Sequence, residues 1–344
     1  MFSAPLSRSG TMAAPFPWFG GKSGACKEVW VAFGDIDNYV EPFAGSAAML
    51  LGAPDGKRVE TINDADGFVA NFWRAISQDP EAVAHHADWP CNENDLFARH
   101  SWLVRQAAEL TERLHADPEW FDARIAGWWC WGACNWIGSG WCSGDGPWVH
   151  DGDGIVDARQ LPHLSAGQGI NRKLPHLSAG QGINRQLPHL GNAGRGAYIR
   201  GWFALLQERL RDVRVACGDW SRVVKDSVTT RHGLTGVFLD PPYTKGKMDY
   251  AAGGVGTNLP MQVQGWCVAN GGNKKLRIVL CGHAGEHDLL LAHGWKIRTW
   301  DAFKGYAITE EAVENFASET LWCSPHCVAE KVTGTFDMFE DQNV

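Results

Sequence analysis

The sequence contains no hydrophobic run long enough for a transmembrane helix. Such a helix requires roughly 18–20 consecutive apolar residues, and no apolar stretch of the chain approaches that length. The first residues, MFSAPLSRSGTMAAPF, also lack the continuous apolar core of a secretory signal. These absences predict a cytoplasmic protein that does not associate with membranes and whose surroundings are reducing.

Paired CxxC motifs are absent too, although the chain of 344 residues contains ten cysteines. In reducing surroundings, cysteines are thiols or metal ligands rather than a disulfide framework. Cys130, Cys134 and Cys142 cluster in a segment rich in tryptophan and glycine, and Cys323 and Cys327 lie near the C-terminus. Neither group has the spacing of a zinc site with matching partners. We therefore expect buried free thiols and no bound metal, with zinc binding as the alternative.

Net positive charge is also missing, since the formal net charge is −8. For a protein that binds nucleic acid, the distribution of charge matters more than its sum. From Arg159 to Arg214, nine lysines and arginines against two acidic residues leave a local excess of seven positive charges. This segment, called the basic band below, is compatible with DNA binding, and an ordinary solvated surface is the alternative.

Apolar segments that alternate with helical ones indicate the fold class. Residues 39–51 predict a strand end, a glycine turn and a helix start, and a helix is expected at about 68–78. Further strands are predicted at 59–63, 213–217, 237–239, 276–281, 295–300 and 319–323. This alternation predicts an α/β fold with mostly parallel strands. Such sheets bind ligands beyond the carboxyl ends of their strands, where the polar motifs of this chain fall.

Roughly 130 residues between the second and third strands do not fit the alternation. They begin with amphipathic helical sequence at about 94–126 and continue through a segment rich in glycine, tryptophan and cysteine at 127–148. Nine of the eighteen tryptophans lie between residues 89 and 148. We expect most of them to pack in the interior and a few to stack on bases or wedge into a duplex.

The same region contains a tandem repeat. LPHLSAGQGINR occurs at 161–172 and 174–185, and LPHL begins a third copy at 187, so the period is 13 residues. This unit is too short for a common solenoid repeat. Its proline, glycine, serine and asparagine predict an irregular loop. Contact of its histidines and arginines with phosphates is the alternative.

Asp240, Pro241, Pro242 and Tyr243 directly follow the apolar run 236–239, which predicts a buried strand. Two prolines at the end of a strand make a rigid loop. The acid and a proline carbonyl of this loop can accept both N–H bonds of an exocyclic amino group, while the aromatic ring stacks on the base. An ordinary proline-rich turn is the alternative interpretation.

A glycine turn, EPFAGS, occupies residues 41–46 and lets a ligand approach the backbone. It lacks the glycine-and-lysine pattern of a phosphate loop, which favours a nucleoside-type ligand without a polyphosphate. Asp64, at the end of the second strand, is placed like the acid that binds a ribose diol, and a helix cap is the alternative. Upstream, the segment WFGGK ends in Lys22, and by itself it indicates a turn with a solvated lysine.

Together these segments resemble the Dam-like (D12 class) DNA adenine-N6 methyltransferases, including those of phages. The matching segments, in the family's order, are PWFGGK at 17–22, VEPFAGSAAML at 40–50, IND at 62–64, CGDW at 217–220 and VFLDPPY at 237–243. Residues 276–288 and 318–327 are similar to sheet-closing segments of phage relatives. The glycine motif reads FAGSA where many relatives end in glycine, a difference that should not prevent cofactor binding.

The resemblance, which covers most of residues 15–328, implies a Rossmann-like S-adenosylmethionine-dependent methyltransferase sheet with a mainly helical or irregular insertion. The implied parts are a discontinuous catalytic domain at 1–79 and 213–330, a target-recognition insertion at 80–212 that includes the repeat at 160–190, and a C-terminal tail at 331–344. Double-stranded DNA in the cytoplasm or nucleoid of a bacterial cell is the implied partner. We expect no obligatory protein partner and a monomer or weak dimer, and restriction–modification or masking of phage DNA as the setting.

The resemblance also implies S-adenosylmethionine as the methyl donor. The residues implied to bind it are Trp18, Lys22, Glu41, Phe43, Ala44, Gly45, Ser46, Asp64, Asp219, Trp220 and Asp240. Trp18 and Lys22 would lie near its methionine end, with the turn 41–46 as the floor of the site. Asp64 would hold the ribose hydroxyls. Asp219 would accept from the amino group of the cofactor's adenine, with Trp220 beside that ring.

The implied activity is site-specific methylation of adenine N6 in DNA. The target base would flip out of the duplex and stack on Tyr243. Asp240 and the Pro241 carbonyl, with Pro242 stiffening the loop, would accept its two N–H bonds during a direct displacement that needs no metal. Alternatives are a cytosine-N4 DNA methyltransferase, an enzyme that methylates RNA or a protein amide, and a catalytically silent DNA-binding relative. Asp rather than Asn at position 240 argues against an amide substrate, and the intact Asp240 and Tyr243 argue against a silent protein.

Overall fold

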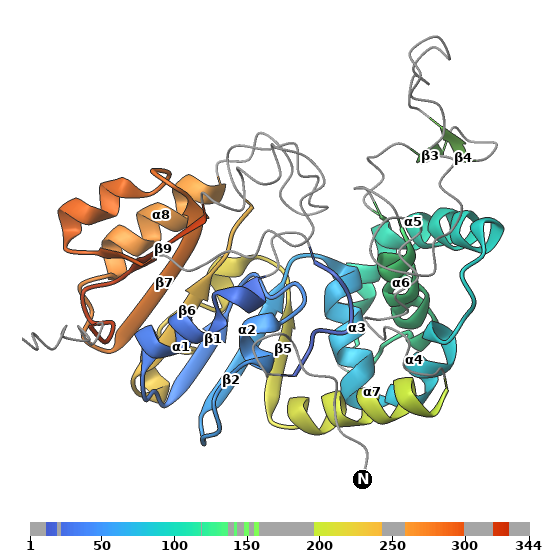
Figure 1. Cartoon of the computed structure of the whole chain (residues 1–344), viewed down its shortest axis with the longest axis horizontal. Helices are drawn as coiled ribbons and strands as arrows, with labels where there is room; N and C mark the ends of the chain where they lie inside the picture. Colours follow the sequence, from blue (N-terminus) through green and yellow to red (C-terminus); the bar gives the residue numbers. More distant parts are fainter. Residues whose placement is uncertain are drawn as a thin grey trace, which may run out of the picture.

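The computed structural model describes residues 12–18, 22–117, 119–136, 141–142, 148–150, 155–157, 196–242, 259–298 and 319–329. Seven strands of this part form one sheet in the order β5-β2-β1-β6-β7-β9-β8, with helices packed around it (Figure 1). Their bounds are β1 Asn38–Glu41, β2 Val59–Asp64, β5 Val213–Cys217, β6 Thr235–Leu239, β7 Leu276–His283, β8 Lys296–Arg298 and β9 Glu319–Cys323. The strands from β5 to β7 are parallel, whereas β9 is antiparallel to both of its neighbours. This architecture confirms the predicted α/β fold class and is consistent with a Rossmann-like methyltransferase sheet.

The two faces of the sheet bury alternate residues of the same strands. Phe238 of β6 and Val279 of β7 belong to one core cluster, whereas Val237 and Ile278 belong to the other. Successive side chains of a strand point to opposite faces, so a strand that is covered on both sides needs apolar residues throughout. β6 is accordingly buried along its whole length. This is why the central strands occur in the sequence as short unbroken apolar runs.

The helices divide between these two faces. The first cluster includes residues of α1 (Cys26–Phe33), α2 (Ala48–Leu51), α3 (Gly67–Gln78) and α7 (Ala197–Leu210). The second includes residues of α8 (Leu259–Asn270) and of the 3-10 helices η4 (Trp220–Arg222) and η6 (Asp288–His293). A separate antiparallel pair is formed by β3 (Trp148–His150) and β4 (Ile155–Asp157). The sheet is therefore the middle layer of three.

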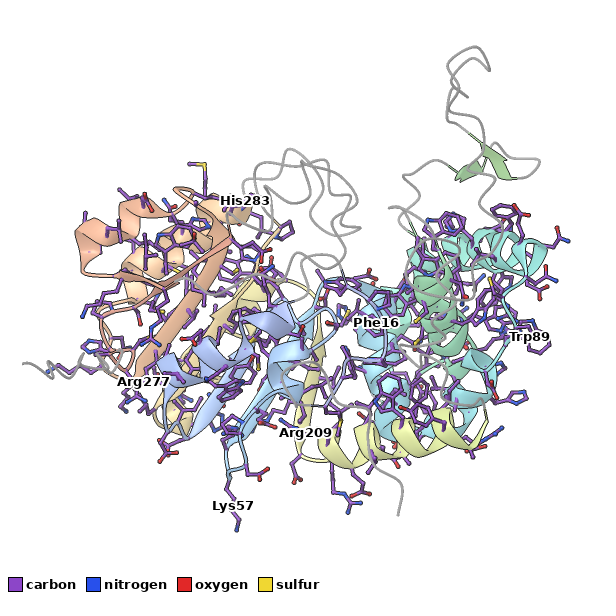
Figure 2. The ribbon with its side chains drawn as sticks, in the orientation of Figure 1. Phe16, Lys57, Trp89, Arg209, Arg277 and His283 are labelled. Atoms are coloured by element: carbon purple, nitrogen blue, oxygen red, sulfur yellow. The ribbon has the colours of Figure 1, made fainter. Side chains whose placement is uncertain are left out.

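Three further helices, α4 (Pro80–Ala87), α5 (Glu93–Ala116) and α6 (Ala123–Asn135), gather beyond α3 at the β5 end of the sheet (Figure 1). These three helices are called the helical layer below. Phe16, from the N-terminal segment, lies between the helical layer and the rest of the fold (Figure 2). Its ring meets Phe72 of α3 and Trp129 of α6 edge-on, with centroids 5.1 and 4.7 Å apart. Such aromatic pairs contribute beyond their buried area, so the N-terminal segment helps to hold the helical layer on α3.

The helical sequence expected at 94–126 is two helices rather than one. α5 ends at Ala116, and Asp122 caps α6 by accepting a hydrogen bond from the Ile125 amide at 2.8 Å. An Asp at this position satisfies an amide that the first helical turn would leave unpaired. α6 then continues to Asn135, through the first part of the tryptophan-rich segment.

The tryptophans of the helical layer differ in exposure. Trp129 and Trp131 are buried, whereas Trp89 is 45% exposed. The Arg99 guanidinium lies over the rings of Trp89, Trp128 and Trp131 at 5.1, 5.0 and 4.3 Å. A cation over an indole face is favourable, more so when water is excluded. These contacts therefore help to stabilise the layer.

The described cysteines form no disulfide bonds, and those of the tryptophan-rich segment are buried as predicted. The thiols of Cys130 and Cys134 both donate to the carbonyl of Pro15, at 3.8 and 3.7 Å. Burial raises the pKa of Cys130 well above its ordinary value. These thiols fasten the N-terminal segment to α6 and are poor nucleophiles.

The basic band is only partly within the described residues. Its described arginines include Arg200, Arg209 and Arg211, which form ion pairs with Glu81, Glu60 and Glu208 at 2.5, 2.6 and 2.6 Å respectively. In the described part of the basic band, neighbouring carboxylates therefore offset some of the excess positive charge that was counted from the sequence. Tyr243, the repeat at 160–190 and the tail at 331–344 lie outside the described residues. Among the helices that are described, none is long and apolar enough to cross a bilayer.

Candidate active site

The order of the strands reverses between β1 and β6. From β1 the chain continues to β2 and then β5 on one side, and from β6 it continues to β7 on the other. α/β proteins bind ligands outside the carboxyl ends of the strands at such a switch point. Glu41 ends β1, and Asp240 directly follows β6. The fold therefore places the glycine turn and the Asp-Pro-Pro loop on the two strands that flank this point.

The turn after β1 depends on Gly45, whose φ angle is +46°. Its amide donates to Oδ2 of Asp64 at 2.9 Å, and its carbonyl accepts from Nε1 of Trp73 at 2.9 Å. A Cβ at this position would lie 2.3 Å from Nε1 of Trp18. Only glycine satisfies both the backbone angle and the space, because any other residue is strained at positive φ. Trp18 thus lies against the turn, as the resemblance implies.

The residues around Gly45 are inaccessible from solvent. Ala44 and Ser46 are 6% and 5% exposed. Ala47, which stands where many relatives have glycine, is fully buried and has a φ of +51°. The left-handed conformation costs a residue with a Cβ roughly 1–2 kcal/mol. The turn therefore keeps the geometry that glycine prefers although the residue is alanine.

Asp64 bridges two backbone amides at the carboxyl end of β2. Oδ2 accepts from Gly45, and Oδ1 accepts from the amide of Asp66 at 2.9 Å. The helix cap is Asp66, which accepts from the Phe68 amide at 2.8 Å at the start of α3. The alternative interpretation of Asp64 as the helix cap is therefore wrong, because the cap lies two residues later. Burial raises the pKa of Asp64, and burial together with the charge of Asp64 raises the pKa of Asp66 to about 7.

Asn63, at the end of β2, forms hydrogen bonds to the segments that follow β1 and β5. The sequence analysis did not predict this role. Nδ2 of Asn63 donates to the Pro42 carbonyl after β1 at 2.9 Å and to the Gly218 carbonyl after β5 at 3.0 Å. Buried amides require such partners. The side chain therefore sets the spacing between the turns that follow three neighbouring strands. The signal was present in the motif IND, whose asparagine precedes the acid that was singled out.

Phe43 and Trp220 stack across the ends of β1 and β5, with centroids 6.0 Å apart and planes at 29°. Asp219 is exposed and caps η4, where Oδ1 accepts from the amide of Ser221 at 2.9 Å. Trp266 of α8 meets Trp220 edge-on at 6.3 Å. The structure thus brings these residues of the predicted cofactor site together on the sheet's second face.

Lys22 is buried, at 5% exposure, so its interpretation as a solvated lysine is wrong. Its Nζ lies 3.0 Å from Oε1 of Glu319 and 3.4 Å from Oδ2 of Asp240. We call these three residues the Lys22 cluster. Burial lowers the pKa of the ammonium, but Asp240, the Cys281 thiol and Glu319 together raise it well above its ordinary value. Burial raises the pKa of Glu319, and Lys22 opposes that shift. Lys22 is therefore cationic at neutral pH.

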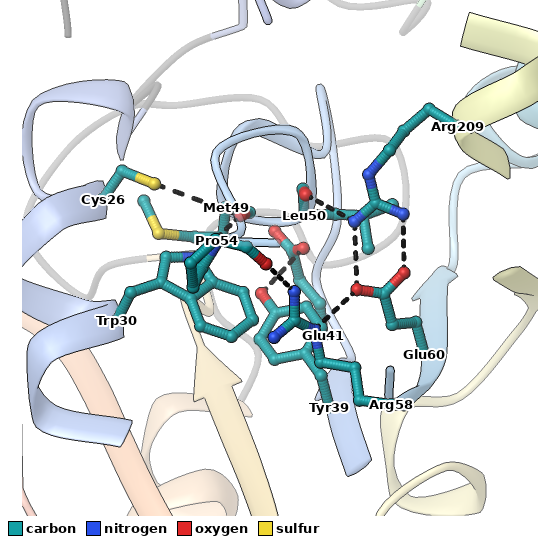
Figure 3. A network of polar contacts seen from close by, with 10 residues as sticks. All are labelled: Cys26, Trp30, Tyr39, Glu41, Met49, Leu50, Pro54, Arg58, Glu60 and Arg209. Carbon is teal, nitrogen blue, oxygen red and sulfur yellow. Dashed lines mark hydrogen bonds and ion pairs between the residues drawn. The ribbon is translucent and has the colours of Figure 1, made fainter. Parts of the chain in front are cut away.

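Glu41 lies on the first face of the sheet and is 2% exposed (Figure 3). Its Oε2 accepts from the Tyr39 hydroxyl at 2.9 Å. The pKa of the carboxyl is raised to about 8, mainly by burial and in addition by the charges of Asp240 and Asp64, while hydrogen bonds from Tyr39 and the Leu50 backbone oppose the shift. Within the described part of the chain, no ion pair of Glu41 occurs. A cationic ligand group would stabilise its ionised form.

A second ionic group lies beside Glu41 in Figure 3 and consists of Arg58, Glu60 and Arg209, called the Glu60 cluster below. Glu60 accepts from Arg58 at 2.9 Å and from both terminal nitrogens of Arg209 at 2.6 and 3.0 Å. Arg209 also donates to the Leu50 carbonyl at 2.8 Å. A bidentate pair of this kind is strong and directional. It fastens α7 to β2 and to the end of α2.

Seven of the predicted residues thus fall into three groups. Trp18, Gly45 and Asp64 form one connected set around the glycine turn, and Phe43 with Trp220 forms a second across the same strand ends. Lys22 forms ion pairs with both Asp240 and Glu319. The sequence analysis missed Glu319 because residues 318–327 were considered only as a sheet-closing segment.

Residues 18–107 match the family model described as D12 class N6 adenine-specific DNA methyltransferase. No curated protein matches the chain. The matched segment begins at Trp18 and ends within α5, so it contains Lys22, the glycine turn and Asp64 but neither Asp240 nor Glu319.

Proposed function

We propose that the chain transfers the methyl group of S-adenosylmethionine to adenine N6 at a specific site in double-stranded DNA, since residues 18–107 match the family model described as D12 class N6 adenine-specific DNA methyltransferase. The observation that carries the proposal is the pairing of Lys22 with Asp240 at 3.4 Å, directly after β6 at the switch point of the sheet. Asp240 is followed there by two prolines and preceded by a fully buried strand. A rigid acid at this edge suits recognition of an amino group.

The side chains at the strand ends fit the proposed cofactor. Glu41, Asp64 and Asp219 end or follow the neighbouring strands β1, β2 and β5. S-adenosylmethionine carries an ammonium group, a ribose diol and an adenine amino group, each of which donates hydrogen bonds to carboxylates. The turn at Gly45 has no room for a Cβ, which suits close approach of a ligand to the backbone.

We assign the cofactor contacts accordingly. Trp18 and Lys22 would lie near the methionine end, with Glu41 and the turn 43–46 as the floor. Asp64 would hold the ribose, and Asp219 with Trp220 would hold the adenine. When bound, the cofactor supplies an electrophilic methyl group.

The proposed mechanism follows from the residue types at the Asp-Pro-Pro loop. The target adenine flips out of the duplex, which costs a few kcal/mol, and stacking on Tyr243 returns roughly 1–3 kcal/mol. Asp240 and the Pro241 carbonyl accept both N–H bonds of the amino group, which turns its lone pair toward the cofactor site. They also stabilise the positive charge that N6 gains. The extra proton then leaves to water.

Labelled cofactor tests this proposal. The protein is incubated with DNA and methyl-labelled S-adenosylmethionine, and the DNA is digested to nucleosides. N6-methyladenine is the expected product. Label found only in N4-methylcytosine would reassign the enzyme to the cytosine-N4 class, since both bases offer an amino group to the same loop. Equal absence of transfer by wild type and Asp240→Ala, with equal DNA binding, would support a silent DNA-binding protein.

We further propose that residues 80–212 recognise the target sequence and that 1–79 with 213–330 form the catalytic domain. α4, α5 and α6 lie to one side of the sheet, which supports a separate role for them (Figure 1). Deletion of one 13-residue copy of the repeat should leave methyl transfer largely intact if the repeat is only a loop. Loss of transfer without unfolding would assign the repeat to DNA contact.

A further inference from the structure

Glu319 lies at the same edge of the sheet as Asp240. β9 is antiparallel to β7, so its first residue meets the carboxyl ends of the parallel strands, and Glu319 pairs with His283 at the end of β7. Oε1 of Glu319 lies 3.0 Å from Nζ of Lys22, and the same Nζ lies 3.4 Å from Asp240. One ammonium group is therefore shared between two carboxylates that are 79 positions apart in sequence.

A lysine beside Asp240 opposes the proposed chemistry. In that reaction a bond forms between N6 and the methyl carbon while the bond from that carbon to the sulfonium sulfur breaks. The electron pair stays on sulfur, and N6 later releases one proton to water. Positive charge thus grows on the amine that Asp240 holds, and an ammonium nearby repels it. In a buried site this repulsion is stronger than in water.

Glu319 removes this opposition. Lys22 and Asp240 alone have no net charge, whereas the cluster with Glu319 has a net charge of −1. The ammonium also lies nearer to Glu319 than to Asp240. The side chains of Lys22 and Glu319 are 4% and 9% exposed, so water screens their charges little.

We propose that Glu319 is a positioning residue, which draws the Lys22 ammonium away from Asp240 and keeps the cluster anionic during methyl transfer. This inference rests on the proposed function and deepens it. Among the residues that the structure describes, the titratable groups that act on Lys22 include Asp240 after β6, Cys281 on β7 and Glu319 on β9.

Two variants separate charge from shape. Glu319→Gln keeps the shape and an acceptor but removes the charge, and Glu319→Asp keeps the charge but shortens the side chain. We expect Glu319→Gln to lower the single-turnover rate of N6 methylation about 10–100-fold, with KM for DNA within about threefold. The Asp variant should be faster than the Gln variant. A purely structural role predicts the reverse order.

The pH profile gives a second readout. In Glu319→Gln, Lys22 keeps one carboxylate neighbour instead of two, so its pKa falls. Its deprotonation at alkaline pH restores a net charge of −1 to the site, and the rate should rise there. Wild type should show no such rise, because its ammonium stays protonated.

Binding and folding controls accompany these rates. Calorimetric binding of S-adenosylmethionine to Glu319→Gln should stay within about threefold of wild type if Glu319 acts on the chemical step. Glu60→Gln makes the same change in a second buried ion-pair cluster, which contains no residue of the proposed site, so any loss of stability there should leave the rate unchanged. Thermal unfolding confirms that each variant is folded.

The outcomes separate the inference from the function. If wild type produces N6-methyladenine and Glu319→Gln is equally fast, the inference is wrong and the proposed function stands. If Gln is faster than Asp and no alkaline rise occurs, the inference is likewise wrong. If Glu319→Gln does not fold, the test is Glu319→Asp, which keeps the charge. A rate for that variant more than about tenfold below wild type would show that the charge of Glu319 is not what matters. If wild type transfers no methyl group, the proposed function fails and the inference falls with it.

Discussion

The Lys22 cluster and the Glu60 cluster contain the same kinds of side chain in opposite proportion. In the Glu60 cluster one carboxylate lies between two guanidinium groups, and in the Lys22 cluster one ammonium lies between two carboxylates. Glu60 and Glu319 are equally buried, with side chains 9% exposed. The clusters therefore differ in the sign of their net charge, +1 and −1, rather than in burial.

Position in the sheet explains the difference. Glu60 is the second residue of β2 and meets Arg209 from α7, so its cluster joins a helix to the amino half of a strand. The Lys22 cluster lies at the opposite edge, beside the proposed reaction centre. A buried ion pair contributes little net stability compared with apolar packing, but removing one partner is strongly destabilising. One cluster thus orders the fold, and we propose that the other arranges charge for catalysis.

The same chemical change in both clusters tests this contrast most directly. Asp240→Asn should lower the rate of methyl transfer by about 10²–10³-fold, because the amide keeps one acceptor but stabilises growing positive charge poorly. The measurement is single-turnover transfer from labelled cofactor, with DNA binding as the control. A rate within a few-fold of wild type would remove Asp240 from the chemistry.

Glu60→Gln should instead lower the free energy of unfolding by about 2–3 kcal/mol and leave the turnover rate within about twofold. The value lies below that for a fully buried pair because the amide keeps hydrogen bonds and Arg209 is 24% exposed. Urea denaturation measures the stability. An activity loss as large as that of Asp240→Asn in folded protein would break the contrast between the clusters.

Glu41 is the buried carboxyl between the two clusters and should make stability depend on pH. Its pKa is raised from 4.5 to about 8 by burial, so the folded state holds its proton more tightly than the unfolded state. The contribution is fully present below pH 4.5 and is lost as pH rises toward 8, by up to about 1.4 kcal/mol per pH unit. Urea denaturation of cofactor-free protein across this range measures the slope. Glu41→Gln should flatten it, and an unchanged slope in that variant would assign it to other groups.

Two glycines near the clusters provide a smaller contrast. Gly45→Ala places a Cβ at positive φ and against Trp18, and should lower the free energy of unfolding by about 1–3 kcal/mol. It should also weaken binding of S-adenosylmethionine, measured by calorimetry. Gly56→Ala meets only Arg58, at 3.4 Å, and should change stability by less than about 0.5 kcal/mol. Similar effects of the two substitutions would show that the turn has no special requirement for glycine.

Local sequence was sufficient where a feature depends on neighbours in the chain. The strands β6 and β7 were recognisable because both faces are covered, which gives each an unbroken apolar stretch, at 236–239 and 278–281. The glycine turn was recognisable because only glycine tolerates the conformation at position 45. The amphipathic sequence at about 94–126 did not give the bounds of α5 and α6, although Asp122 is a normal capping residue.

The rest of the site depends on contacts between distant segments. Lys22 was interpreted as solvated because a short polar turn is usually exposed, yet the ends of β6 and β9 enclose it. Asn63 was passed over because its two partners, the carbonyls of Pro42 and Gly218, are 21 and 155 positions away. The partners of Lys22 and Asn63 are therefore not among the residues next to them in the sequence.

By itself the sequence determined an α/β sheet, a glycine turn, a proline-stiffened acidic loop and a resemblance to adenine-N6 methyltransferases. Each of these follows from side chains within a few residues of one another. Only the tertiary structure decided that Glu319 joins Lys22 and Asp240. The reason is the direction of β9: an antiparallel strand brings its first residue to the edge where parallel strands bring their last, and that direction is set by pairing with β7 across the sheet.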